Sequence, residues 1–396
     1  MLKTILKHQN PCRIIGSRFK TSSVQYVESR ARDPTFEKLM DKYKNLLKVI
    51  AIQDLILANP TNNPPSVSLD FLSRLSQKLH LNRGAASFLR KYPHIFHIFY
   101  DPNKSQTFCR LTDAAVDISR QEAEAINASL PLVVDRLVRL LSMSTTKSLP
   151  LRAVFKVWRE LGLPDDFEDS IISHNSHIFR LVDAHEPNTH ILTLTDEMRD
   201  KSFVASVEDW RVTECCKEDC GDDRMEIRFS FKHSYPPGMR LRRDFKAKVK
   251  EWQRLPYAGP YEEMGENKRS KAGTMAVEKR AVAVVHEFLS LTVERMVEVE
   301  KISHFRKSFA IDLNIRDLFL DHPGMFYLST KGKRHTVFLR EAYERGRLID
   351  SNPVYSARRK LLDLVVLGRH AMLTKESRSV ENFQTETPCL KDENGG

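Results

Sequence analysis

Apolar residues recur along most of the chain at the three- and four-residue spacing of a packed helix face. One such helix is predicted to begin at Asp33-Pro34, since Asp favours the cap position and Pro the first turn. Two more long helices are predicted, at residues 130–141 and from about Met275 to Ile302. The apolar positions of the first helix are Phe36, Leu39, Met40, Tyr43, Leu47 and Ile50.

A shorter pattern occurs three times between these helices. Residues 78–96 align without a gap on residues 308–326, and a third copy with one extra residue covers residues 160–179. Self-similarity of this kind indicates a repeated structural unit. Each copy reads as a helix, a polar break, a second helix and two short strands around a turn. The aligned pairs in the ungapped copies are Leu79/Phe309, Leu81/Ile311, Phe88/Leu318, Leu89/Phe319, Pro93/Pro323 and Phe96/Phe326.

This order of elements sets the predicted fold class. Helix, turn, helix and hairpin in succession are typical of a winged-helix-like module. We predict a mainly α protein with small β-hairpins (α+β), in which repeated helix-turn-helix-hairpin units are joined by longer helices. The units are expected at about residues 68–115, 149–198 and 305–343, with Ser68 as the cap of one helix and Asn82 at the start of the next.

The two ends of the chain differ in composition from the middle. Residues 1–27 contain Lys and Arg but no acidic residue, which predicts a transit peptide over residues 1–31. Lys and Arg outweigh Ser and Thr there, so the mitochondrion is the expected destination and the chloroplast the alternative. A disordered basic arm that stays on the protein and binds nucleic acid, instead of directing import, would have the same composition. Residues 371–396 are polar and predicted to form a disordered tail.

The charge balance indicates a polyanionic partner. The chain has 63 Lys and Arg against 52 Asp and Glu, a formal net charge of +11. Such a field favours nucleic acids or anionic membrane surfaces. No stretch approaches eighteen consecutive apolar residues, so no membrane insertion is expected.

Cysteine spacing and sequence motifs do not favour a metal centre or an enzyme. Cys215, Cys216 and Cys220 are clustered, but a second pair of ligands at zinc-finger spacing is missing, so no metal and no other cofactor is expected. The chain contains no P-loop, G-x-G-x-x-G, nucleophile elbow or H-E-x-x-H motif. A thiol hydrolase is the enzymatic alternative. The Cys residues of this chain, however, lack a recognisable nucleophile context.

Residues 236–256 carry the densest group of cations. A turn at residues 236–238 precedes a helix predicted from Arg240 to Arg254, and residues 231–255 contain only two acids. Leu241, Phe245, Val249 and Trp252 recur at helical spacing and predict one packed face of this helix. The cations therefore lie on the other faces, as phosphate neutralisation requires, and aromatic or Arg side chains can stack on unpaired bases. A solvated helix face without a ligand is the alternative. The candidate RNA-binding residues are Arg240, Arg242, Arg243, Lys246, Lys248, Lys250, Arg254, Trp252, Tyr257 and Tyr261. The next candidates, in the repeated units, are Arg83, Arg90, Lys91, Lys331, Lys333 and Arg334.

Several segments resemble the plant organelle RNA recognition family. They are RDPTFEKLMDKYKNL, FLRKYPHIF, LPLRAVFKVWRELGLPDDF, YPPGMRLRRDFKAKVKEWQRLPYAGPYE and HPGMFYLSTKGKRHTVFLREAY. The resemblance covers residues 32–370, and the box EWQRLPYAGPYE is its most specific part, with Ala258 where the family favours Ser. It implies an RNA-binding region that acts on intron-containing organellar transcripts and promotes splicing of group II introns, together with other organellar splicing factors. It implies no catalytic residues.

Two non-enzymatic alternatives remain open at this point. One is a nuclear winged-helix protein that binds duplex DNA, although its base-reading residues would be expected in one short stretch. The other is a scaffold that holds splicing proteins together without binding RNA tightly. The sequence does not identify the intron or the nucleotides that are bound.

Overall fold

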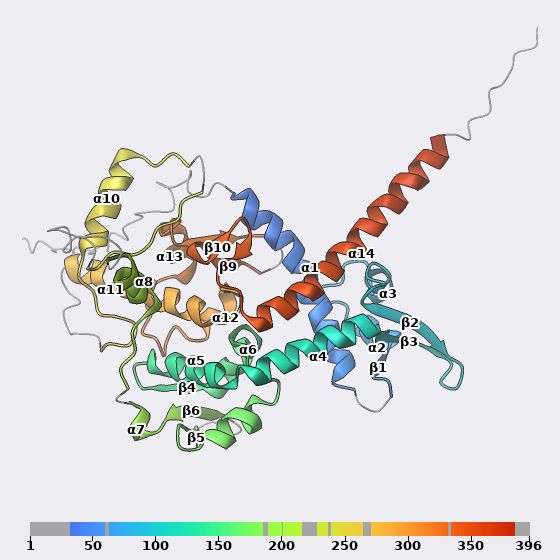
Figure 1. Ribbon diagram of the computed structural model, residues 1–396, viewed down its shortest axis with the longest axis horizontal. Helices are drawn as coiled ribbons and strands as arrows, with labels where there is room; N and C mark the ends of the chain where they lie inside the picture. The colour runs from blue at the N-terminus through green and yellow to red at the C-terminus, as the bar shows by residue number, and fades with distance from the viewer. Residues whose placement is uncertain are drawn as a thin grey trace, which may run out of the picture.

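The computed structural model describes residues 32–59, 63–184, 189–199, 201–215, 228–236, 239–263, 271–331 and 334–384. Helices dominate, and the sheets are small and antiparallel, which confirms the predicted α+β class (Figure 1). The predicted transit peptide lies outside the described residues. Of the helices described, none combines the length and the apolar character needed to cross a bilayer.

One order of elements occurs three times: a long helix, a short strand, two short helical segments and a hairpin, with the second helical segment divided into two consecutive parts in the second unit. The first unit consists of α1 (Pro34–Leu57), β1 (Ser66–Ser68), α2 (Leu69–Arg74), α3 (Ala85–Leu89), β2 (Phe96–Asp101) and β3 (Gln106–Leu111). The second consists of α5 (Leu130–Ser142), β4 (Ser148–Pro150), α6 (Leu151–Leu161), η2 (Glu168–Ile172), η3 (Ser173–Asn175), β5 (Phe179–Asp183) and β6 (His190–Leu194). The third consists of α11 (Lys271–Leu291), β7 (Met296–Glu298), α12 (Val299–Ser303), α13 (Ile315–Asp321), β8 (Phe326–Ser329) and β9 (Thr336–Leu339). The strand orders are likewise equivalent: β1-β3-β2, β4-β6-β5 and β7-β9-β8.

Backbone geometry confirms the alignment of the repeats. His80, Gly162 and Ala310 occupy the same aligned position, and all three have a positive φ, of 56°, 73° and 51°. The residue after each donates its N–H to a carbonyl five residues back, as from Leu81 to Ser76 and from Ile311 to Arg306. The turn between the two short helical segments is therefore the same in all three units.

The structure corrects three details of the sequence prediction. Each hairpin gains a third strand, because β1, β4 and β7 span only three residues and are too short to show an alternating pattern. The helix expected from Met275 to Ile302 ends at Leu291, since Arg295 adopts a positive φ of 52° before β7 begins. Helix α3 starts at Ala85 after Gly84, rather than at Asn82.

The remaining helices connect and cover the units. They are α4 (Asp113–Ala128), α7 (Asp196–Arg199), α8 (Ser206–Cys215), α10 (Arg243–Arg254) and α14 (Pro353–Gln384). A short hairpin of β10 (Tyr343–Glu344) and β11 (Arg347–Leu348) precedes α14. Helix α14 packs on α4 and α1 and continues to Gln384. Residues 371–384, expected in a disordered tail, are therefore helical, and the rest of that tail lies outside the described residues.

Two large hydrophobic clusters hold the units together. One joins the second and third units and includes Trp252 of α10. The other fills the first unit and extends through α1 to Met296, Tyr327 and Phe338 of the third sheet. Helix α1 thus belongs to the core of the first unit and also covers one face of the third sheet, where Phe36 lies 5.1 Å from Tyr327 and 5.3 Å from Phe338, measured between ring centroids.

Candidate nucleic-acid interface

The predicted basic helix is present as α10. Leu255, in extended conformation, ends the helix, and Arg242, also extended, precedes it. Phe245 and Trp252 point into the protein and are each 7% exposed, so one face of α10 is fixed by packing. The helix begins at Arg243 and not at Arg240 as predicted, so two of the seven candidate cations precede it. All seven are exposed: Arg240 and Arg242 before the helix, and Arg243, Lys246, Lys248, Lys250 and Arg254 on it.

Four of these cations form a stripe along α10. Arg242, Lys246, Lys250 and Arg254 are spaced four residues apart, which places successive members about 6 Å apart along the helix axis on neighbouring positions of one face. Arg243 adds a cation at the first turn, where the free N–H groups of a helix also favour anions. A stripe of this kind suits a polyanion that runs along the helix.

Trp252 is part of the interior and not of the exposed surface. Its ring centroid lies 4.7 Å from that of His322 and 5.1 Å from that of Phe231. At 7% exposure the indole has no open face on which a base could stack. The expectation that Trp252 binds RNA by stacking is therefore corrected: the helical spacing that marked it as apolar reflects packing.

Tyr257 and Tyr261 also serve the fold. The Tyr257 hydroxyl accepts a hydrogen bond from Arg211 at 2.6 Å, and burial raises its pKa to about 12. Tyr261 donates to Glu287 on α11 at 2.7 Å, and burial raises its pKa far above the usual range. Both rings pack against the larger hydrophobic cluster. The EWQRLPYAGPYE box, residues 251–262, thus anchors α10 to α8 and α11.

Lys279 on α11 is the centre of that anchor. Its ammonium is fully buried and donates to the carbonyl oxygens of Trp252, Gln253 and Leu255 at 2.8, 2.9 and 2.8 Å, at the C-terminal end of α10. Cations are favourable at a helix C-terminus, where carbonyls lack intrahelical partners. Burial, and to a lesser degree the nearby Arg211, lowers the pKa of Lys279 to about 7. Three aromatic rings surround the ammonium at 4.9–5.3 Å from their centroids: Phe231, Trp252 and Tyr257.

Gln253 secures the preceding segment to α10. Its side-chain amide pairs with the N–H and the carbonyl of Phe231, at 2.5 and 2.8 Å, and lies 2.5 Å from Nδ1 of His233. Burial, and then the neighbouring His322, lowers the pKa of His233 to about 4. His233 is therefore neutral at physiological pH.

Sequence reasoning missed Lys279 and Gln253 as the residues that position α10. Lys279 stands between Glu278 and Arg280 on α11, and a cation in such a run of charges normally indicates a side chain that reaches solvent. The signal that could have found it is the aromatic content of the box, because Tyr257 and Trp252 together provide the rings that enclose an ammonium.

The secondary candidates divide into exposed and paired cations. Arg83 and Arg90 are exposed, whereas Lys91 is half-buried. Lys331 forms an ion pair with Asp41 at 2.6 Å, and Arg334 pairs with Glu298 at 2.8 Å. Lys333 lies outside the described residues. The third unit therefore uses its described candidate cations in contacts within the protein, while the first unit keeps cations at the surface.

Comparison with known proteins gives one family over nearly the whole length. Residues 31–370 match the model of the Plant organelle RNA recognition domain. Protein ROOT PRIMORDIUM DEFECTIVE 1 of Arabidopsis thaliana is 37% identical over 356 residues, which cover 88% of this chain and 86% of that protein. Protein WHAT'S THIS FACTOR 9, mitochondrial, of the same plant is 30% identical over 364 residues, 91% and 90% of the two chains. Protein WHAT'S THIS FACTOR 1, chloroplastic, of Zea mays is 31% identical over 348 residues, 87% and 68% of the two chains. No solved structure matches.

Proposed function

The chain belongs to the plant organelle RNA recognition family, and on that premise we propose that it promotes the splicing of group II introns by binding and chaperoning intron RNA. RNA in an organelle is its partner, as the family description states and as organellar relatives support. The protein itself catalyses no step, and the intron RNA performs the chemistry. Other organellar splicing factors are the protein partners that we propose.

The observation that supports this proposal most is the exposed cation stripe on a rigidly held helix. Phosphate neutralisation with counterion release depends on several cations in one place, and α10 provides them with its other face fixed by packing. Neutralised phosphates allow intron segments to approach each other. Because the supporting contacts come from Lys279 and Gln253, the stripe keeps its shape before RNA is bound.

We further propose that the three units are winged-helix-like. The order helix, strand, helix, helix, hairpin and the pairing of the first strand with the last support this assignment. In such modules the second short helix and the hairpin are the parts that face nucleic acid. The first unit, whose candidate cations Arg83 and Arg90 are exposed, therefore adds such a surface to the stripe on α10.

Charge removal from α10 tests the proposal. Replacing Arg242, Arg243, Lys246 and Lys250 together with Gln should lower the affinity for intron RNA while the circular dichroism spectrum is kept, since Gln has good helix propensity. If each cation neutralises one phosphate, the slope of log affinity against log salt should flatten by about 0.7 per contact on single strands, or nearly 3 in total.

A matched variant controls for net charge. Replacing Lys38, Lys42, Arg152 and Lys156 with Gln removes the same charge from exposed positions on α1 and α6. We expect a much smaller change in salt slope from this variant. Equal losses of affinity in the two variants, or none in the α10 variant, would show that α10 is a solvated face.

We propose the mitochondrion as the compartment. The acid-free basic composition of residues 1–27 supports this choice, while relatives with both mitochondrial and chloroplastic names support an organelle in general. A fluorescent protein that carries residues 1–35 at its N-terminus should enter mitochondria. Cytosolic or nuclear fluorescence would contradict an organellar role, and plastid fluorescence would change only the compartment.

A further inference from the structure

Each three-stranded sheet has a core face and an outer face. Side chains alternate across a strand, so neighbours along the chain point to opposite faces. In the first unit, Phe96, Cys109 and Leu111 point into the hydrophobic cluster. Their neighbours on the other side, His97, Phe99, Phe108 and Arg110, make up what we call the outer face of the first sheet. The register of β2 and β3 places His97 opposite Arg110 and Phe99 opposite Phe108.

The outer face of the first sheet is a continuous row of rings and cations. The ring centroids of His97, Phe99 and Phe108 follow each other at 6.0 Å, and both neighbouring pairs are stacked. The Arg110 guanidinium lies 5.4 Å from the Phe99 centroid, and its Nε donates to Nδ1 of His97 at 3.3 Å. Lys104 lies 5.1 Å from the Phe108 centroid. His97 is exposed, Phe99 is half-buried, and Phe108 at 7% exposure forms the floor.

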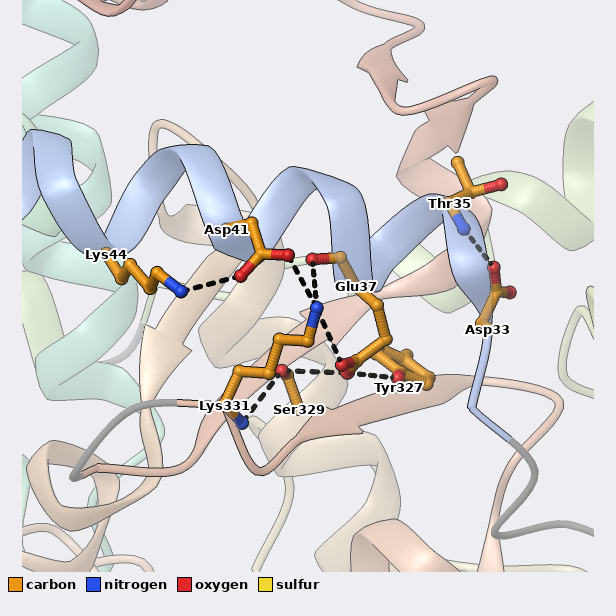
Figure 2. Close-up of polar contacts among 8 residues, drawn as sticks. All are labelled: Asp33, Thr35, Glu37, Asp41, Lys44, Tyr327, Ser329 and Lys331. Carbon is orange, nitrogen blue, oxygen red and sulfur yellow. Dashed lines mark hydrogen bonds and ion pairs between the residues drawn. The ribbon is translucent and has the colours of Figure 1, made fainter. Parts of the chain in front are cut away.

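The third unit shows what covers this face when an occupant is present. By strand register, its outer face carries Tyr327, Ser329 and Phe338. The first turns of α1 lie on this face, as Figure 2 shows for Tyr327 and Ser329. Phe36 stacks on Tyr327. Glu37 accepts hydrogen bonds from the hydroxyls of Tyr327 and Ser329 at 2.5 and 3.0 Å (Figure 2). An aromatic ring and a carboxylate thus fill the aromatic outer face of the third sheet.

On the equivalent face of the second unit, Arg180, Val182, Ile191 and Thr193 take the four corresponding positions, and none of them is aromatic. From the strand registers, Val182 and Ile191 stand where the first unit has Phe99 and Phe108. The charges of the two units differ as well. Residues 66–111 carry seven Lys and Arg against two Asp, whereas residues 148–194 carry four Lys and Arg against seven Asp and Glu. The first unit alone therefore combines an open aromatic outer face with a strong positive charge.

These comparisons indicate a ligand that offers a flat ring and negative charge. We propose that the outer face of the first sheet binds unpaired bases of single-stranded RNA, which stack on His97 and Phe99 while Arg110 and Lys104 neutralise the flanking phosphates. The proposal rests on the RNA binding proposed above and adds to it a second contact site, which binds bases as well as phosphates. The acid at the end of this hairpin, Asp101, accepts a hydrogen bond from the N–H of Asn103 at 3.0 Å in the turn.

Two labelled strands separate base stacking from phosphate contact. One is oligouridine of about twelve nucleotides, within the site sizes known for single-strand binders, and the other is a base-free phosphodiester strand of equal length. Phe99→Leu should lower the affinity of the full-length protein for oligouridine about tenfold, the effect of losing one stacked base, and leave the base-free strand unaffected. Arg110→Gln should lower both affinities and flatten the salt slope by about 0.7.

Val182→Ala, at the equivalent position of the second unit, is the matched control and should change neither affinity. Photocrosslinking of the unaltered protein with 5-iodouridine strands tests the site without any substitution, and should label residues 96–111. Unchanged oligouridine binding by folded Phe99→Leu, or crosslinks confined to residues 240–254, would overturn the inference and leave the function proposed for α10 intact. Failure of the unaltered protein to bind either strand would instead overturn the proposed function.

Discussion

Lys279→Met tests whether one buried ammonium holds the basic helix in place. Met has a similar length but no donor, so the carbonyls of Trp252, Gln253 and Leu255 would lose the partner that now lies at 2.8–2.9 Å. Each hydrogen bond from a charged group contributes about 1.5–3 kcal/mol. Desolvation of the ammonium costs several kcal/mol and offsets part of the stabilisation from the three hydrogen bonds. We expect the free energy of unfolding to fall by about 2–4 kcal/mol.

The measurement is urea denaturation at about pH 6, below the Lys279 pKa of about 7, where the ammonium is charged. Lys156→Met, on the exposed side of α6, is the control and should stay within about 0.5 kcal/mol of the unaltered protein. RNA affinity should also fall in Lys279→Met, although every cation of α10 is kept. A change of unfolding free energy under about 0.5 kcal/mol would refute the reasoning, because the apolar contacts of Phe245 and Trp252 would then suffice to hold α10.

Two further predictions concern the core and the pH dependence. Phe326→Ala and Phe96→Ala should each lower the free energy of unfolding by about 3–5 kcal/mol, because both rings are almost fully buried. Phe71→Ala, at 41% exposure, is the control and should lower it far less. An equal loss in all three variants would show that burial does not set the cost. In the folded protein the pKa of His233 is lowered from 6.5 to about 4, so as pH falls the unfolded chain takes up a proton on His233 first. The free energy of unfolding should therefore drop by up to about 3 kcal/mol between pH 6.5 and pH 4. Urea titrations should show that His233→Asn flattens this part of the profile of unfolding free energy against pH, and an unchanged profile would contradict the assignment.

Local patterns predicted much of the fold. Asp33 caps α1 as expected, with its carboxylate accepting from the N–H of Thr35 at 3.0 Å. The ungapped alignment of residues 78–96 and 308–326 predicted equivalent turns, because a turn that needs a positive φ imposes the same spacing on the apolar residues around it. The basic helix followed from its own periodicity. All of these features depend on residues close together in the sequence.

Contacts between distant residues could not be predicted in this way. Arg358 donates to Glu122 at 2.8 Å, and Arg340 to Asp33 at 2.7 Å; all four side chains are buried, and the partners lie 236 and 307 positions apart. A buried cation is stable only with a partner, yet nothing in a single sequence says which acid that is. The same reason explains why Trp252 was predicted to bind RNA: the Lys279 ammonium, which packs against its ring, comes from another helix.

The positions of the two proposed contacts bear on how the protein would chaperone an intron. Helix α10 lies at one end of the molecule and the β2–β3 hairpin at the other (Figure 1). A few consecutive nucleotides cannot reach both, so simultaneous contact requires either an extended strand or two separate intron segments. Once one segment is bound, the other is held at a high effective concentration, and the joint affinity exceeds that of either contact alone. Charge at α10 without base contacts, and base stacking at the hairpin, together favour single-stranded segments over duplex RNA, whose bases are not free to stack. A protein of this shape would hold unpaired intron segments apart from wrong partners while they find the pairing that splicing needs.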